Sequence, residues 1–138
     1  MGFPTRTLVV FAAICAPAIA GATPQSAQDL QLAFETQARQ QSPAFMGFSA
    51  QAGEQFFKST HGNDWSCATC HTHDPRNAGK HAKTDKDIPP LAPSANPERF
   101  TSIDKVEKWF KRNCGDVLGR ACTLQEKGDV LAYLLSLK

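Results

Sequence analysis

The sequence predicts an all-α fold, and three observations support this prediction. Beyond residue 20 the chain holds few of the β-branched aliphatic residues that favour strands; they are Ile88, Ile103, Val106, Val117 and Val130. Four segments begin at helix-capping residues and carry apolar side chains at helical spacing. The stretch 72–97 is instead rich in Asp, Asn, Lys, Gly and Pro, which indicates an ordered loop between two pairs of helices.

The first two helices are expected at about 26–40 and 49–58. Ser26 is the predicted N-cap of the first helix. In the second helix, Gly53 and Phe57 are four residues apart and share a face. Glycine in a helix interior costs about 1 kcal/mol relative to alanine, so we expect a close contact with another helix at Gly53.

The last two helices follow the loop. The third is expected over about 102–113, with Asp104 in its first turn. The fourth begins with a capping box formed by Thr123 and Glu126. Its apolar stripe consists of Leu124, Val130, Leu131, Leu134, Leu135 and Leu137.

Residues 1–20 have the pattern of a secretory signal peptide. Arg6 precedes an apolar run over 8–18, and Ala18-Ile19-Ala20 provides the small residues of a cleavage site, so the mature chain is expected to start near Gly21. The run is shorter than the ~20 residues that a bilayer needs, which argues against stable membrane insertion. We therefore expect a periplasmic or otherwise exported protein, cleaved near Ala20.

The remainder of the chain is long enough for one small domain. We divide it into an N-terminal helical extension, 21–47, and a main domain, 48–138. The formal net charge of +2 is small, so we expect no nucleic-acid partner.

The cysteines identify the chemistry. Cys15 lies in the leader, which leaves Cys67-x-x-Cys70-His71 and the pair Cys114 and Cys122. Seven residues separate the second pair, whereas zinc sites usually leave two to four, and a thioredoxin-like motif needs a βαβ context that the composition does not favour. The motif instead predicts one covalently attached haem c, held by thioether bonds to both cysteines, with His71 on the iron.

The order of these features resembles the class I cytochrome c fold. The resemblance rests on two segments: the helix with Gly53 before Cys-x-x-Cys-His, and the closing segment Asp129-Val130-Leu131-Ala132-Tyr133-Leu134. The resemblance covers Phe48 to Leu137 and implies that these two helices cross at the glycine. It also implies that a proline carbonyl within 89–91 accepts a hydrogen bond from His71 and fixes its ring.

The second axial ligand of the iron is less apparent. Class I cytochromes c supply a methionine well after the haem motif, but the only methionines are Met1 and Met46, which precede it. The remaining histidines, His61, His73 and His81, stay open as alternatives, although His73 follows the motif too closely to reach the opposite face of a haem.

The third helix offers another candidate. At about 100° per residue, an arc of about 80° holds Ile103, Val106, Phe110 and Asn113. This arc is an apolar face that we expect to turn toward the haem, with Ile103, Val106 and Phe110 lining the distal pocket. Asn113 at its end needs a polar partner; the alternative is that Asn113 caps the helix. Trp109 is expected to pack at the edge of this face.

Cys114 and Cys122 are predicted to form a disulfide, because an exported compartment permits one. The bond would close a loop of nine residues and contribute roughly 2.5 kcal/mol. It either staples a small domain or, in addition, holds Asn113 over the iron.

The chain also resembles a narrower family, the cytochrome c″ and Sphaeroides-type haem proteins. The matching segments are Cys67-Ala68-Thr69-Cys70-His71-Thr72, Ile88-Pro89-Pro90-Leu91-Ala92-Pro93, Arg99-Phe100-Thr101-Ser102-Ile103-Asp104-Lys105-Val106-Glu107, Asn113-Cys114 with Cys122, and Ala132-Tyr133-Leu134-Leu135. In cytochrome c″ the residue before the first disulfide cysteine is a histidine that ligates iron. Asn113 stands there in this chain, as in the Sphaeroides-type branch, so the resemblance implies that Asn113 is the second iron ligand.

The function that this resemblance implies is redox-gated ligand binding. An amide oxygen suits ferric iron better than ferrous iron, so Asn113 would leave on reduction and ferrous haem would bind O₂, CO or NO. The implied electron donor is a dihaem c-type or a b-type cytochrome. The alternative is a plain electron carrier with bis-His or fixed His/Asn iron, and turnover of O₂ or NO stays open.

Overall fold

The computed structural model describes residues 1–2 and 26–138. The predicted cleavage site near Ala20 and Cys15 lie outside the described residues. The elements are α1 (Ala27–Gln41), α2 (Ala50–Lys58), α3 (Cys67–His71), β1 (Gly79–Lys80), β2 (Asp87–Ile88), α4 (Ile103–Leu118) and α5 (Leu124–Ser136). The predicted all-α fold is confirmed, because the described strands are two residues each, paired antiparallel with Gly79 opposite Ile88. No helix in residues 1–2 and 26–138 has the length and apolar character to cross a membrane.

Helix starts follow the caps in the sequence. The side chain of Ser26 accepts a hydrogen bond from the backbone N–H of Asp29 at the start of α1. Thr123 and Glu126 form the predicted capping box of α5. A second capping box, formed by Ser66 and Thr69, starts the one-turn helix α3 and was not predicted. Each cap satisfies backbone N–H groups that have no partner within the helix.

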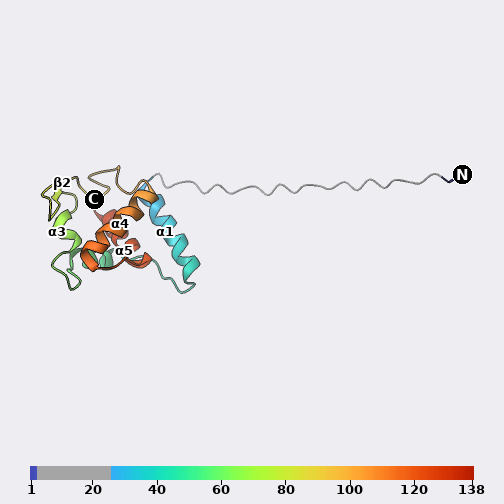
Figure 1. Ribbon diagram of the computed structural model, residues 1–138, viewed down its shortest axis with the longest axis horizontal. Helices are drawn as coiled ribbons and strands as arrows, with labels where there is room; N and C mark the ends of the chain where they lie inside the picture. Colours follow the sequence, from blue (N-terminus) through green and yellow to red (C-terminus); the bar gives the residue numbers. More distant parts are fainter. Residues whose placement is uncertain (3–25) are drawn as a thin grey trace.

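Among the described helices, α2 and α5 make the most extensive contact, which lies behind α4 in the view of Figure 1. A Cβ added to Gly53 would lie 1.8 Å from the carbonyl oxygen of Asp129, so no other residue fits there. The N–H of Ser49, the N-cap of α2, donates to Oδ1 of Asp129 at 2.7 Å. The expected crossing at the glycine is confirmed.

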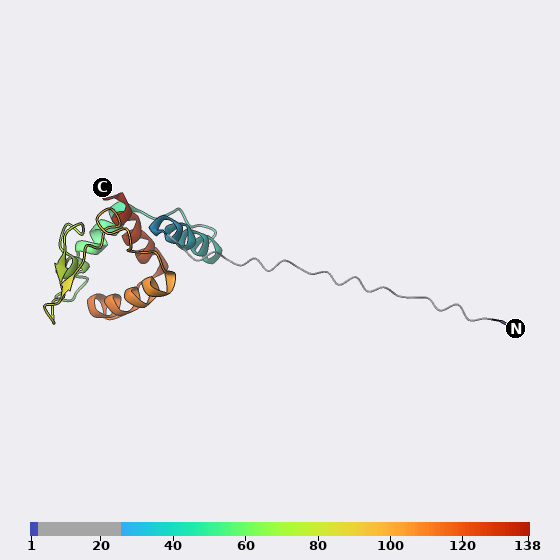
Figure 2. The same cartoon turned by 90° about the horizontal axis from the view of Figure 1, so that it is seen from above.

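The first helix packs on α5 from the other side (Figure 2). Leu30 and Phe34 of α1 are fully buried, and Nε2 of Gln31 donates to the carbonyl of Gly128 at 3.4 Å. One core cluster consists of Ala27, Leu30, Phe34, Val106 and Leu131, and a second of Phe57, Ala68, Val130, Tyr133 and Leu134. The N-terminal helix is therefore part of the core.

The fourth helix stands apart from the others. In Figure 2, α4 lies on the opposite side of the domain from α2 and α3, and its backbone packs closely against no other described element. It joins the core through side chains such as Val106 and Phe110. The predicted end near residue 113 is wrong, because α4 continues to Leu118 and stops at Gly119, which has a φ of 69°.

Candidate haem site

The Cys-x-x-Cys-His motif forms α3. Both thiols are free and half-buried, and they lie one helical turn apart. A Cβ on Gly79 would lie 2.0 Å from the carbonyl oxygen of Cys70, so the β1–β2 hairpin can press directly against the motif only because residue 79 is glycine. The motif is thus held between the α2–α5 crossing and the hairpin.

The Cys67 thiol lacks the lowered pKa of a reactive cysteine. Burial raises the pKa of the Cys67 thiol to about 11, whereas reactive thiols have a lowered pKa. The Sγ of Cys70 accepts a hydrogen bond from the backbone N–H of Ala82 at 3.4 Å. Across the described part of the chain, no cluster of three or more His, Cys, Asp or Glu side chains is arranged to hold a metal ion.

His71 presents a neutral imidazole. Burial, the larger cause, and the positive charge of Arg99 together lower its pKa to about 4. The ring lies 6.4 Å from the ring of buried Phe57, which in turn lies 5.6 Å from the ring of Tyr133. A covalently attached haem requires two thiols for its thioether bonds and a neutral ring nitrogen for its iron, and this turn has all three.

The proline carbonyls near the motif have other donors than expected. Nη2 of Arg99 donates to the carbonyl of Pro89 at 2.8 Å, and its Nε donates to Pro90 at 3.0 Å. Nδ2 of Asn96 also donates to Pro90, at 3.3 Å. Among the described residues no hydrogen bond joins His71 to these carbonyls, so the expected bond is not found.

Asn113 lies inside α4, not at its end. Since the C-cap is Gly119, the interpretation of Asn113 as a helix cap is wrong. The residue is half-buried, next to buried Cys114 and one turn before buried Val117. No side-chain hydrogen bond is formed by its amide within the described part of the chain, which leaves both the oxygen and the nitrogen without a protein partner.

The rest of the predicted distal face is placed as follows. Val106 is buried, while Ile103 and Phe110 are half-buried against the same core cluster. Trp109 is 52% exposed, so the prediction that it packs at the edge of this face is wrong. Arg112 covers it instead, with its guanidinium 5.7 Å from the ring centre.

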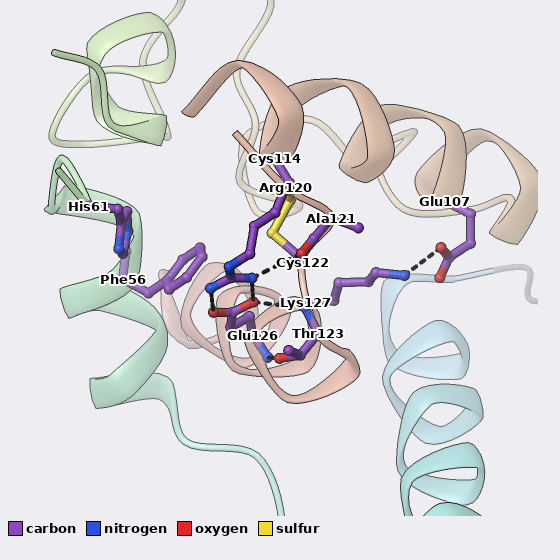
Figure 3. Close-up of a disulfide and its surroundings, with 10 residues drawn as sticks. All are labelled: Phe56, His61, Glu107, Cys114, Arg120, Ala121, Cys122, Thr123, Glu126 and Lys127. Atoms are coloured by element: carbon purple, nitrogen blue, oxygen red, sulfur yellow. Dashed lines mark hydrogen bonds and ion pairs between the residues drawn. A yellow bond between two sulfur atoms is a disulfide. The ribbon is translucent and has the colours of Figure 1, made fainter. Parts of the chain in front are cut away.

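The other candidate ligands have partners or are exposed. Nε2 of His61 is 2.7 Å from the carbonyl of Phe56, and the centres of the two rings lie 4.3 Å apart with their planes tilted by 44° (Figure 3). Nδ1 of His81 accepts a hydrogen bond from the N–H of Lys83 at 3.2 Å. His73 and Met46 are exposed.

The predicted disulfide between Cys114 and Cys122 is confirmed, with Cα atoms 5.6 Å apart. Figure 3 shows it joining α4 to the segment that leads into α5. Beside it, Nη2 of Arg120 lies 2.6 Å from Oε1 of Glu126, and this hydrogen bond with Arg120 is the main cause that lowers the pKa of Glu126 to about 2.

Two contacts that the sequence did not indicate connect the end of α4 to the haem-motif side. Nδ2 of Asn63 donates to the carbonyl of Val117 at 2.7 Å. Nζ of Lys83 lies 3.9 Å from Asp116 and 4.7 Å from the centre of the Trp65 ring. A hollow of about 460 Å³ opens beside them, lined by Gly62, Asn63, Asp64, Trp65, Gly115, Asp116 and Gly119. Nothing in the local sequence signals contacts between such distant positions.

The residues present fit a c-type haem. Two free thiols and a neutral imidazole share one helical turn, and aromatic side chains surround them. Across the domain, α4 is separated from this turn and carries an amide without a protein partner. This arrangement suits a flat apolar group held on one side and approached by a polar ligand from the other.

Comparison with known proteins agrees with this chemistry. Residues 43–134 match a family described as "Domain of unknown function (DUF1924)". The chain is 38% identical to cytochrome c″ of Methylophilus methylotrophus, over 95% of this chain and 94% of that protein. It is 43% identical to cytochrome c-type protein SHP of Cereibacter sphaeroides, over 94% of this chain and 97% of that protein.

Solved structures of the same two proteins share the fold. Oxidized cytochrome c″ matches with a TM-score of 0.70 and 41% identity, covering 81% of this chain and 94% of that chain. Oxidized SHP, described as an oxygen binding cytochrome c, matches with a TM-score of 0.71 and 42% identity, covering 83% and 99%. The chain therefore belongs to the DUF1924 family and, with cytochrome c″ and SHP, to the c-type cytochromes, which carry covalently attached haem c.

Proposed function

We propose that this protein is an exported monohaem cytochrome with His71 and Asn113 as axial ligands, in which Asn113 leaves on reduction so that O₂, CO or NO can bind. The observation that carries the proposal is the unpartnered, half-buried amide of Asn113 on a helix that stands apart from the haem motif. When bound, the haem supplies one-electron chemistry and a binding position for diatomic gases.

The proximal residues have distinct roles in this proposal. Cys67 and Cys70 hold the haem by thioether bonds, and His71 donates a ring nitrogen that burial keeps free of a proton. Phe57 shields the imidazole from water and is itself packed against Tyr133. The covalent bonds keep the haem in place while the distal side changes.

Asn113 provides the gate. Its amide oxygen is a hard, weak donor that prefers ferric iron to ferrous iron, so gain of one electron from a donor protein weakens its bond. Ile103, Val106 and Phe110 supply an apolar surface on the same face of α4 and keep the position that Asn113 leaves available to a small uncharged ligand.

Bis-His ligation is less well supported. Nε2 of His61 already has the carbonyl of Phe56 as a partner, and Nδ1 of His81 already accepts a hydrogen bond. Use of either residue requires breaking these contacts, whereas Asn113 has none to lose among the described residues. A fixed His/Asn electron carrier is the alternative that the experiment below separates.

Export and an electron donor complete the proposal. The Cys114–Cys122 disulfide suits an oxidising compartment. The outer face of α4 exposes Lys105, Lys108, Trp109 and Arg112, and none of these cations has an ion pair within residues 26–138. A basic face with an exposed tryptophan favours an acidic protein surface as partner; a dihaem c-type or b-type cytochrome with such a surface is the proposed donor.

The test is a comparison of Asn113→Ala and Asn113→His with the wild type, by optical spectra of both oxidation states with and without CO. Asn113→Ala should raise the high-spin fraction of the ferric protein. CO binding to the ferrous protein should stay rapid. Asn113→His should give low-spin iron in both states and slow CO binding, because a stronger ligand must be displaced.

Two results would count against the proposal. If the ferric spectra of the wild type and Asn113→Ala coincide, Asn113 is not a ligand, and His81 is the next residue to replace. If wild-type ferrous protein stays low-spin and does not bind CO, the protein is a plain electron carrier. Mass spectrometry of Cys67→Ser and Cys70→Ser variants tests the covalent attachment separately.

A further inference from the structure

Asn63 lies in the loop between α2 and α3, four residues before Cys67. The loop turns sharply, because Gly62 has a φ of 85° and the N–H of Asn63 donates to the carbonyl of Thr60 at 3.0 Å. The turn aims the side chain of Asn63 away from its own loop. Its Nδ2 reaches α4 and donates to the carbonyl of Val117 at 2.7 Å.

This carbonyl is one that the helix cannot satisfy by itself. Val117 is the second-last residue of α4, and the last four carbonyls of a helix have no partner within it. Asn63 therefore acts as a cap supplied from a different segment. It connects the chain just before the haem motif to the end of the helix that carries Asn113.

We propose that Asn63 is a positioning residue for Asn113. Val117 lies one turn beyond Asn113 and is buried, so a bond that fixes the Val117 carbonyl fixes the depth and tilt of the turn between them. The inference rests on the proposed role of Asn113 as iron ligand. In it, the loop before α3 sets how closely the amide of Asn113 approaches the haem.

The other contacts of α4 do not supply this constraint. Only one other side-chain hydrogen bond within residues 26–138 joins α4 to another element, from Lys127 to Glu107, and it lies in the first half of the helix. The disulfide ties Cys114 to the segment before α5, away from the haem motif. The pair of Lys83 and Asp116 is 3.9 Å apart and exposed, and exposed pairs of this kind contribute little.

Asn63→Ala is the first variant to measure. Loss of one such hydrogen bond should shift the equilibrium between bound and released Asn113 in the ferric protein by about fivefold. The high-spin fraction of the ferric spectrum should rise. The reduction potential should also increase, because the ferric state loses more stabilisation by Asn113 than the ferrous state does. CO binding to the ferrous protein, from which Asn113 has already left, should change little.

Matched variants separate positioning from a general loss of structure. Asn63→Asp keeps the shape but cannot donate, so it should shift the spectrum at least as far as Asn63→Ala. Asn63→Gln keeps the donor and should restore most of the wild-type spectrum. Gln31→Ala removes another amide-to-carbonyl bond, on the α1 side of α5, and should leave the spectrum unchanged.

Measurements in the Asn113→Ala background separate the role of Asn63 as a positioning residue from the role of Asn113 as the iron ligand. There, Asn63→Ala should have no further spectral effect, since no amide remains to be positioned. A spectral shift that persists in this background overturns the role of Asn63, as does an unchanged spectrum of Asn63→Ala when Asn113→Ala alone alters it. If Asn113→Ala itself alters nothing, the proposed function fails first.

Discussion

The α2–α5 crossing and α4 lie on opposite sides of the proposed haem and are held by different means. At the crossing, backbone meets backbone at Gly53, and the buried carboxylate of Asp129 bonds the start of α2. Within residues 26–138, α4 is held mainly by side chains: part of one apolar face, one disulfide and a few polar contacts.

This difference in attachment suits the crossing and α4 to different roles. A backbone crossing has no room to move without breaking van der Waals contact, so it suits the side that carries the covalent motif. A helix attached by side chains can change its distance from the haem at smaller cost. The following predictions break or sharpen this contrast, in order of decreasing effect.

Replacement of the crossing glycine should have the largest effect. Gly53→Ala places a Cβ 1.8 Å from the carbonyl oxygen of Asp129, and we expect the free energy of unfolding to fall by about 3 kcal/mol or more. The matched change on the other side is Gly115→Ala in α4, where a Cβ meets nothing within 4 Å; it should stabilise the protein by about 0.5–1 kcal/mol. Chemical denaturation measures both, and equal effects would contradict the contrast.

Removal of the disulfide should loosen α4 alone. The double variant Cys114→Ser, Cys122→Ser should lose roughly 2.5 kcal/mol of stability and gain a high-spin ferric fraction. Hydrogen exchange should speed up along α4, while the amides of α5 at the crossing keep their protection until the protein unfolds as a whole. Equal loss of protection in both helices would show that α4 is not a separate unit.

Charge reversal on the outer face of α4 should leave the haem side untouched. Lys105→Glu with Lys108→Glu should slow reduction by an acidic protein donor, such as reduced flavodoxin, by about tenfold at low ionic strength, and the effect should disappear in high salt. Reduction by neutral reduced lumiflavin should keep its rate. If the reduction rate falls with both donors, the two lysines contribute to the folding of α4 and not to recognition of a donor protein.

The smallest effect concerns the ion pair at the start of α5. The hydrogen bond with Arg120 holds the pKa of Glu126 down at about 2, below the usual glutamate value of about 4.3. Because the folded pKa is the lower one, this stabilisation is present above about pH 4.5 and is lost as the pH falls toward about 2.

Glu126→Gln tests this dependence, since glutamine can still form the capping box. The wild type should be more stable by about 1 kcal/mol at pH 6, a value reduced by the solvent exposure of Arg120, and the difference should nearly vanish at pH 2.5. Glu35→Gln, at a residue without an ion pair within 26–138, serves as the control. A difference that is the same at both pH values would exclude the ion pair as its cause.

Local signals predicted much of this molecule. The caps at Ser26 and Thr123, the close helix contact at Gly53 and the disulfide all follow from side-chain chemistry at or near the residue concerned, while the identity of the crossing helix was implied by the resemblance. The end of α4 was predicted too early, near Asn113, yet Gly115 faces open space and the buried positions continue to Val117.

What the sequence could not provide depends on distant segments that meet only in the fold. The bond from Asn63 to Val117 spans 54 positions, and no local pattern selects either partner. Arg99 similarly donates to the carbonyls of Pro89 and Pro90, in the stretch where one carbonyl was expected to accept from His71. Which side chain donates to a given carbonyl depends on how distant segments are arranged in the fold.

The position of α5 has a consequence for the order in which the chain matures. Both α1 and α2 pack on this last helix, and the bond from Gln31 to Gly128 joins positions 97 residues apart. Such long-range contacts cannot form until α5 has been synthesised. The Cys-x-x-Cys-His motif is therefore made before the domain can fold completely, when both thiols are still open to haem attachment.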